Sequence, residues 1–279
     1  MIPLSALAAT LLSALLHAGW NLFLKGSAGD RLVDLAILGI GGSLFGGVLI
    51  ALFGAPVAAA WPYIIASSAI HLVYWTALTR GYAAGDMSHV YTIARGLAPA
   101  LVTLGAVLAA GEVPGPGQGI GVAAISAGVL LVGVNRAAPA AATGWALLTG
   151  CAIAGYSLID ALGVRINGDV FRYKGWGAVF TFLPISLFII ASRGPAAFRA
   201  AAAGRWRVGL IAGAVSSAGF MLVLWAQMRA PIGPITALRE TSVLFGAALA
   251  ALLLKERVTA RRWAGAIVVC AGAVLIGLS

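Results

Sequence analysis

The strongest constraint on the fold is a succession of ten apolar runs in a chain of 279 residues. A helix that crosses the hydrocarbon core of a membrane needs about 20 predominantly apolar residues, and each run approaches that length. Only 9% of the residues are charged, whereas a soluble domain carries about 25%, so a solvated globule is excluded. We therefore predict an all-α membrane protein with ten transmembrane helices. The predicted spans lie at about 3–24, 33–53, 62–82, 87–110, 115–135, 144–165, 175–192, 208–229, 233–254 and 260–278.

The ten runs form two halves that repeat one another. A shift of 144 residues, with no gap, aligns Arg95 with Arg239 and Glu112 with Glu256. Each half then holds five spans, residues 1–136 and 144–279. Because five is an odd number, the second half must enter the membrane from the opposite side, so the repeats are inverted. Inverted repeats are typical of secondary transporters, whose substrate site lies near the midplane of the membrane between the halves.

Two further motifs mark the end of each half. The pairs Gly111-Glu112 and Lys255-Glu256 precede the last run of each half, and both last runs contain G-x5-AG, at 121–128 and 265–272. With the ten-span duplication, these motifs resemble the drug/metabolite transporter superfamily, nearest to its EamA-type branch, over essentially the whole chain. The resemblance implies export or exchange of small metabolites, often amino acids, by alternating access. Segments 91–99 and 237–242 also resemble a subgroup with phosphonate-linked members.

Four charged residues lie inside predicted spans, namely Arg95, Asp160, Arg239 and Glu240. A charge in the bilayer is expensive, so it faces the helix bundle and usually marks a transport pathway. The two arginines hold equivalent places in the halves, and their guanidinium forks suit a carboxylate or a phosphate-type group. The alternative is structural: Arg239 is neutralised by Glu240 or Asp160, and Arg95 bonds to helix carbonyls near a break at Pro99.

The acids are candidates for coupling transport to protons or ions, because buried carboxyl groups in transporters can bind and release them. We expect Glu240 to serve mainly as the salt-bridge partner of an arginine and Asp160 to be the better proton carrier. By contrast, Glu112 and Glu256 lie at helix ends, where we expect them to anchor a loop or cap a helix.

Aromatic and polar residues on the third run share one helical face, since His71, Tyr74 and Trp75 follow the i, i+3, i+4 spacing. Such a face suits a binding-site wall that contacts rings or an ammonium group. The alternative is a belt of aromatic residues at the membrane interface, which does not explain a histidine at mid-span. His17, next to Trp20, is a weaker candidate, because single polar residues often only bridge helices. The predicted substrate-binding residues are Arg95, Arg239, His71, Tyr74, Trp75, Tyr91, Tyr156 and Trp20.

Lysine and arginine residues between the runs set the expected orientation. Twelve of the 18 lie in odd-numbered loops, four in even-numbered loops and two inside spans. This bias predicts cytoplasmic odd-numbered loops and both termini outside, in a bacterial-type inner membrane crossed many times. The four residues assigned to even-numbered loops are Arg165, Arg172, Lys174 and Arg229.

No pattern in the sequence indicates catalysis. There is no HExxH, GxSxG or Walker A motif, and Cys151 and Cys270 show no metal-binding spacing, so we predict no enzyme activity, no metal and no cofactor. The net charge of +10 comes from scattered residues, which does not favour nucleic-acid binding.

These observations favour a secondary transporter for a small anionic or zwitterionic metabolite, foremost an exported amino acid, acting by alternating access. We expect a monomer whose partners are its small-molecule substrate and membrane lipid. The alternatives are an uptake carrier for organophosphonates or similar small anions, and a lipid flippase or scramblase.

Overall fold

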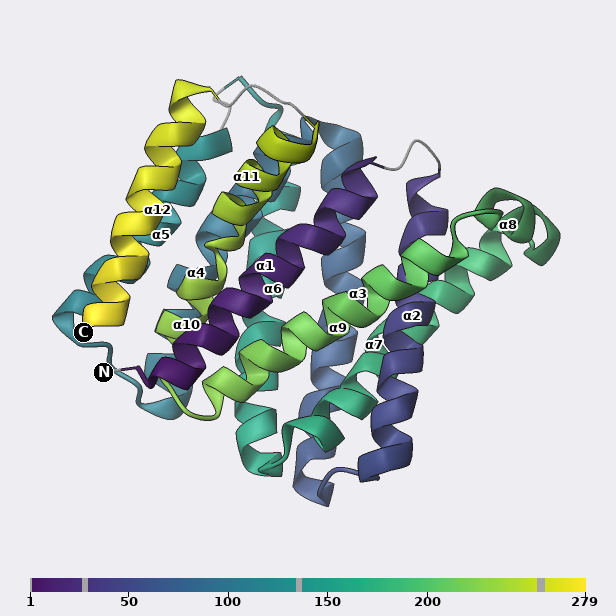
Figure 1. Cartoon of the computed structure of the whole chain (residues 1–279), viewed down its shortest axis with the longest axis horizontal. Coiled ribbons are helices and arrows are strands. Elements are labelled where there is room, and N and C mark those ends of the chain that lie inside the picture. Colours follow the sequence, from purple (N-terminus) through teal and green to yellow (C-terminus); the bar gives the residue numbers. More distant parts are fainter. Residues whose placement is uncertain (1, 27–29, 134–136, 255–258) are drawn as a thin grey trace.

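The computed structural model describes the chain except residues 1, 27–29, 134–136 and 255–258 (Figure 1). Its described residues form helices and no strand, which confirms the predicted all-helical class. The elements are α1 (Leu4–Gly26), α2 (Arg31–Phe53), the 3-10 helix η1 (Ala58–Ala60), α3 (Trp61–Ala84), α4 (Met87–Ala110), α5 (Pro116–Gly133), α6 (Ala140–Asn167), α7 (Val170–Arg193), α8 (Pro195–Ala202), α9 (Trp206–Gln227), α10 (Ile232–Arg239), α11 (Ser242–Leu254) and α12 (Ala260–Leu278).

Every predicted run coincides with helical structure, but the ninth run is divided between α10 and α11. The short helix α8 lies in a segment that the sequence assigned to a loop. Within the described residues, seven helices are long and apolar enough to cross a membrane: α2, α4, α5, α6, α7, α9 and α12. The chain is therefore a multi-pass membrane protein.

Aspartate side chains in the short connections start several of these helices. Asp86 Oδ1 accepts a hydrogen bond from the Ser88 backbone N at 2.7 Å, and Asp169 Oδ1 accepts one from the Phe171 N at 2.8 Å. Such caps satisfy backbone donors that have no partner inside the helix. Because Asp169 caps it, α7 begins at Val170, about one turn before the predicted run.

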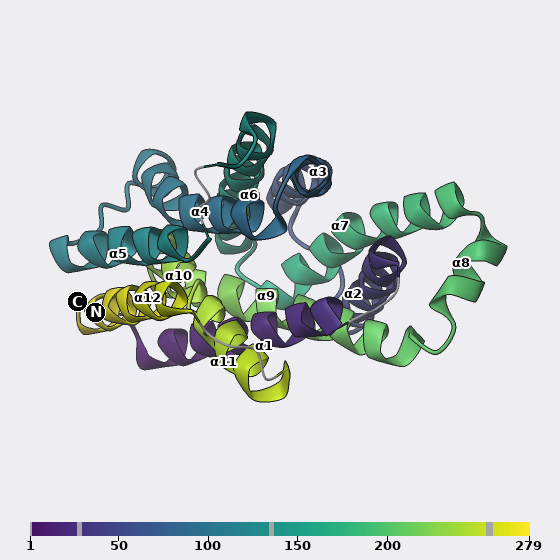
Figure 2. The same ribbon diagram turned by 90° about the horizontal axis from the view of Figure 1, so that it is seen from above.

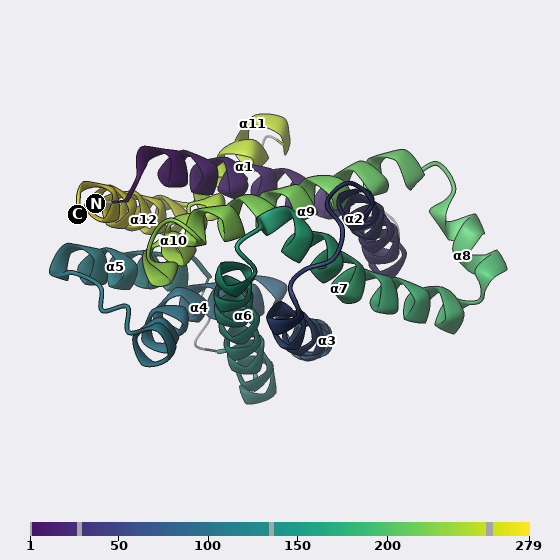
Figure 3. The ribbon, with the colours of Figure 1, turned by 90° about the horizontal axis from the view of Figure 1, so that it is seen from below.

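The helices form two layers, which Figures 2 and 3 show from above and below. One layer contains α1, α9, α10, α11 and α12, and the other contains α3, α4, α5, α6 and α7. Helix α2 packs between α7 and α9 at the end where α8 connects them. The two termini lie side by side at the opposite end of the molecule (Figure 1).

Glycines of the last helix in each half allow α5 and α12 to pack closely. A methyl group on Gly121 would lie 2.8 Å from the carbonyl oxygen of Gly272, and one on Gly128 would lie 2.9 Å from that of Gly265. The lower-numbered glycine of α5 thus meets the higher-numbered glycine of α12, so the two helices cross antiparallel. Small residues permit such contact where lipid supplies no hydrophobic drive.

The helices that carry the two buried arginines differ in continuity. Helix α4 runs unbroken through Pro99, so the predicted break at that residue is wrong. The corresponding segment of the second half is interrupted at Glu240 and Thr241, between α10 and α11. Across this interruption the backbone forms i to i−3 hydrogen bonds, Val243 N to Glu240 O at 3.0 Å and Leu244 N to Thr241 O at 2.9 Å. The chain therefore tightens locally into a 3-10-like turn.

Candidate substrate-binding site

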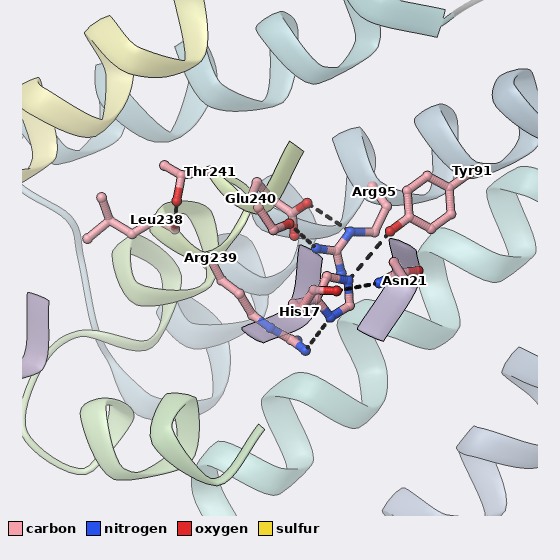
Figure 4. Close-up of polar contacts among 9 residues, drawn as sticks. His17, Asn21, Tyr91, Arg95, Leu238, Arg239, Glu240 and Thr241 are labelled. Carbon is pink, nitrogen blue, oxygen red and sulfur yellow. Dashed lines mark hydrogen bonds and ion pairs between the residues drawn. The ribbon is translucent and has the colours of Figure 1, made fainter. Parts of the chain in front are cut away.

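Arg95 of α4 forms a buried ion pair with Glu240, which ends α10. Its Nε lies 2.9 Å from Glu240 Oε2, and the exposed fractions of the two side chains are 5% and 2%. The Arg95 Nη2 also donates a hydrogen bond to Ser242 Oγ at 3.2 Å. Glu240 is thus the salt-bridge partner of an arginine, as expected, and the alternative that Arg95 bonds to carbonyls near Pro99 is wrong. Figure 4 shows this pair at the centre of the polar contacts.

Arg239 lies beside this pair and forms no ion pair with any acid that the structure describes. Its Nη2 donates a long hydrogen bond of 3.5 Å to His17 Nδ1, and its Cζ lies 5.1 Å from the centre of the Phe220 ring. Throughout the described part of the chain, neither Glu240 nor Asp160 forms an ion pair with Arg239, and Arg239 Nε has no hydrogen-bond partner. Glu240 still acts on Arg239 electrostatically, but its ion pair is with the other arginine.

His17 of α1 connects Arg239 to Tyr91 of α4 (Figure 4). Its Nδ1 accepts from Arg239, which leaves the proton on Nε2, 3.5 Å from the Tyr91 hydroxyl. The predicted site residue Trp20 packs edge-on against His17, with ring centres 5.0 Å apart. Trp20 thus supports the histidine, while His17 itself joins the cluster. The only sequence signal for His17 was a lone polar residue in an apolar run.

The aromatic face of α3 meets Tyr156 of α6. The His71 ring stacks on Tyr156 at 3.9 Å between centres, and the Tyr74 ring lies 5.8 Å from it. Tyr156 in turn lies 6.2 Å from Phe220, the ring over which Arg239 is placed. The predicted residues Arg239, Tyr156, His71 and Tyr74 are therefore brought into one continuous cluster.

Trp75 belongs to the periphery of this cluster. It contacts Tyr74, with ring centres 4.8 Å apart, and packs against two apolar cores, one of α3, α4 and α6 and one of α2, α7 and α8. Its indole N–H is buried and has no hydrogen-bond partner among the described residues. Its position is that of a packing residue behind Tyr74.

Asp160 of α6 lies at the α7 side of the cluster. Its Oδ1 accepts a hydrogen bond from the Tyr173 hydroxyl at 2.9 Å, and Ser67 of α3 contacts the same carboxyl group. The backbone oxygen of Ser67 also accepts a hydrogen bond from His71 Nδ1 at 2.8 Å. Asp160 is thus connected to the aromatic face through Ser67.

Lys174 is a buried cation that the sequence assigned to a loop. It lies inside α7 with 6% of its surface exposed, and its Nζ is 4.9 Å from the centre of the Phe220 ring. The assignment was wrong because α7 starts at its Asp169 cap and takes Lys174 one turn into the helix. Arg172 and Lys174 both lie in this segment, and two charges so close together are unusual inside a membrane span.

Arg165, also assigned to a loop, closes one end of the bundle together with Glu112. Its Nη1 lies 2.5 Å from Glu112 Oε1, its Nη2 donates to Ala230 O at 2.9 Å, and Glu112 Oε2 accepts from the Ile232 backbone N at 2.7 Å. The expectation that Glu112 anchors a loop and caps a helix is confirmed, since Ile232 begins α10. Lys255 and Glu256, the matching pair of the second half, lie outside the described residues.

Among the described residues, no group of three or more His, Cys, Asp or Glu side chains has an arrangement that could hold a metal ion. The cluster instead offers guanidinium, ammonium, imidazole and phenol groups. Such donors can hold an anion and stack on its apolar part.

Comparison with known proteins relates the second half of the chain to a transporter family. Residues 141–278 match the model of the EamA-like transporter family. No curated protein matches the sequence. A solved structure described only as "Crystal structure of protein" is similar over 98% of this chain and 96% of that chain, with a TM-score of 0.73 and 17% sequence identity. At that identity the likeness establishes the fold alone.

Proposed function

Because the chain belongs to the EamA-like transporter family through residues 141–278, we propose that it is a secondary transporter for a small anionic or zwitterionic metabolite, foremost an exported amino acid. Members of this family are transporters rather than enzymes. The proposed mechanism is alternating access, in which the two halves rock around a site near the midplane of the membrane.

The observation that carries this proposal is the charge of Arg239, which forms no ion pair with the acids in the described part of the chain. The side chain is 91% buried, since its exposed fraction is 9%, and it faces His17 and Phe220 rather than a carboxylate. A buried charge without a counter-ion is strongly unfavourable. An acid group of the substrate would supply that counter-ion, with Arg95 next to it and the rings of Tyr91, Tyr156, His71 and Tyr74 around the remainder.

The proposed architecture is ten spans arranged as inverted repeats of residues 1–136 and 144–279. The antiparallel crossing of α5 and α12 at repeat-equivalent glycines supports it. So do the reciprocal contacts of α3 with α6 and of α1 with α9, because α1 corresponds to α6 and α3 to α9 under the repeat. Two halves fused in one chain can complete a pathway, so we propose a monomer in a bacterial-type inner membrane, with both termini outside.

Transport in proteoliposomes tests the function. Amino acids and aminophosphonates would be offered as labelled solutes, and we expect saturable uptake that is accelerated by unlabelled solute on the opposite side. Arg239→Gln should abolish uptake, whereas Arg229→Gln, at an exposed arginine that stacks on Trp225 at 3.8 Å, should leave it intact.

Three other outcomes would change the proposed substrate, function or binding site. Preference for aminophosphonates would favour the organophosphonate carrier, which the same arginine would serve. Movement of labelled lipid without solute transport would favour a scramblase. Equal uptake by the Arg239→Gln variant would refute the site.

Coupling is proposed to involve Asp160, the buried acid with no direct cationic partner among the described residues. Asp160→Asn should retain counterflow, which needs no driving ion, and lose uphill transport driven by a pH gradient. Loss of both activities would instead indicate a structural role for the hydrogen bond to Tyr173.

A further inference from the structure

Two buried cations from different helices lie over the same aromatic ring. Lys174 Nζ of α7 is 4.9 Å and Arg239 Cζ of α10 is 5.1 Å from the centre of Phe220, which belongs to α9. Each is about 5 Å from one point, so the two charges are at most about 10 Å apart. The contact with a ring face replaces only part of the hydration that a buried cation loses.

Among the described residues, neither cation forms an ion pair with an acid. In the part that the structure describes, Lys174 Nζ forms no hydrogen bond and no ion pair, and Arg239 bonds only to a histidine. Asp160 interacts with Lys174 electrostatically but receives its hydrogen bond from Tyr173. Glu240 is held by Arg95. Two like charges in a poorly polar interior repel each other unless an anion comes between them.

The buried charged side chains around Phe220 and the Arg95–Glu240 pair carry unequal numbers of positive and negative charges. In this cluster the buried cations are Arg95, Lys174 and Arg239, and the buried acids are Asp160 and Glu240. One positive charge is therefore in excess. A zwitterion with one acid and one amino group leaves this excess unchanged, whereas a molecule with two acid groups and one amino group cancels it.

We propose that Lys174 and Arg239 form a two-point anion site, and that the transported metabolite is an amino acid with a second acid group. This inference rests on the proposed transport function and sharpens its substrate class. Arg239 holds one acid group through its planar fork, and the Lys174 ammonium acts as a point charge for the other. Phe220 lies beneath both and contacts the carbon chain between them. Lys174 is thus a specificity-determining residue, because it disfavours substrates whose second group is neutral or cationic.

Binding to the purified full chain, measured by isothermal titration calorimetry, tests the proposal with matched ligands. L-Glutamate and L-glutamine differ in the charge of the second group, as do L-aspartate and L-asparagine. We expect the acids to bind at least about tenfold more tightly than their amides, which corresponds to about 1.4 kcal/mol. The analogue of glutamate with a phosphonate in place of the side-chain carboxylate shows which of the two groups the site prefers.

Variants of Lys174 separate this site from general anion binding. Lys174→Gln should reduce the affinity for glutamate about tenfold and leave that for glutamine unchanged, so that the preference disappears. Lys174→Arg, which keeps the charge, should retain the preference. Arg172→Gln, on the same helix but exposed, is the control and should change neither affinity.

The outcomes distinguish the inference from the function on which it rests. If Lys174→Gln keeps the preference, or if the wild-type chain binds the amides as tightly as the acids, the two-point site is refuted while an acid anchor at Arg239 stands. If the Gln variant does not fold, loss of preference in a folded Lys174→Arg variant refutes the proposal equally. If no acid binds and Arg239→Gln changes nothing, the proposed function itself fails.

Discussion

Helix α4 and the pair α10 and α11, which correspond under the predicted repeat, carry equivalent arginines in different surroundings. Arg95 forms an ion pair, and Arg239 forms none with a described acid. Under the shift of 144 residues, Arg95 corresponds to Arg239, and the residue that follows is Gly96 in one half and Glu240 in the other. Glu240 reaches across to Arg95 at 2.9 Å. The equivalent position in α4 is a glycine, which has no side chain to return the interaction. For this reason no described side chain forms an ion pair with Arg239.

The backbone differs at the same place. The Thr241 hydroxyl donates to the Leu238 carbonyl at 2.8 Å, and Ser242 accepts from Arg95, so polar side chains occupy the interruption between α10 and α11. In α4 the matching residues are apolar and end in Pro99, yet the helix continues. Two segments that align in sequence thus differ in charge pairing and continuity, and this difference is the basis for proposing Arg239 as the anchor for a substrate.

Removing the acid of this asymmetric pair should have the largest effect. Glu240→Gln leaves Arg95 as a second unpaired buried cation, and we expect a loss of about 4 kcal/mol in the free energy of unfolding. The double variant Arg95→Gln with Glu240→Gln should recover most of that loss, because no charge is then left alone. Thermal unfolding of the single variants Glu240→Gln and Arg95→Gln and of the double variant measures the coupling; additive effects would show that the pair does not interact.

The contact between α5 and α12 involves equivalent glycines from both halves of the predicted repeat, so substitutions on the two helices should have equal effects. Gly128→Leu and its repeat mate Gly272→Leu should each destabilise the protein by about 3 kcal/mol, since both side chains would meet the backbone of the facing helix. A methyl group on Gly119, also in α5, meets nothing within 4 Å, so Gly119→Leu is the matched control. Size-exclusion chromatography and thermal unfolding should show equal damage in the two variants and none in the control.

The arginines themselves should give unequal effects on binding. Arg239→Gln should weaken binding of the substrate acid at least about 100-fold, roughly 2.7 kcal/mol, because it removes the free guanidinium. Arg95→Gln should weaken binding less than Arg239→Gln does. It should lower the unfolding temperature more, since it leaves the buried Glu240 without its ion-pair partner. Titration calorimetry and thermal unfolding of both variants provide the comparison. Equal losses of affinity would contradict the division of roles.

The smallest effect is expected at the turn between α10 and α11. Thr241→Ala removes one hydrogen bond to the Leu238 carbonyl and should destabilise the chain by about 1 kcal/mol. Because Thr241 neighbours Glu240, the rate of counterflow is the more informative measurement. A rate equal to that of the wild-type protein would argue that the turn does not move during transport.

Much of the fold was accessible to sequence reasoning because its signals are local or periodic. Runs of apolar residues gave the helices, and the no-gap shift related Arg95 to Arg239. The helical face of His71 and Tyr74 was likewise predictable from spacing, since residues three apart share a face in any helix. Trp75, on the same face, shares one apolar core with Tyr74 but also packs against a second core of α2, α7 and α8, which its position along the sequence does not reveal.

Lys174 and His17 could not be identified as site residues from sequence patterns. Lys174 was assigned to a loop because charged neighbours hid the true start of α7, which depends on a cap at Asp169. His17 gave a weak signal because one polar residue has no periodicity. The contacts that make them candidate site residues come from other helices: Lys174 lies over the Phe220 ring, and His17 bonds to Arg239 and Tyr91.

The sequence by itself determined that this chain spans a membrane, and it predicted that its halves repeat and that Arg95 and Arg239, 144 residues apart, hold equivalent places. These properties follow from composition and spacing along one chain. Only the tertiary structure decided that Arg95 is neutralised and Arg239 is not, because an ion pair depends on a separation of a few ångströms between atoms from residues 145 positions apart. The packing of α4 against α10 sets that separation, and with it the arginine that we propose binds the substrate acid.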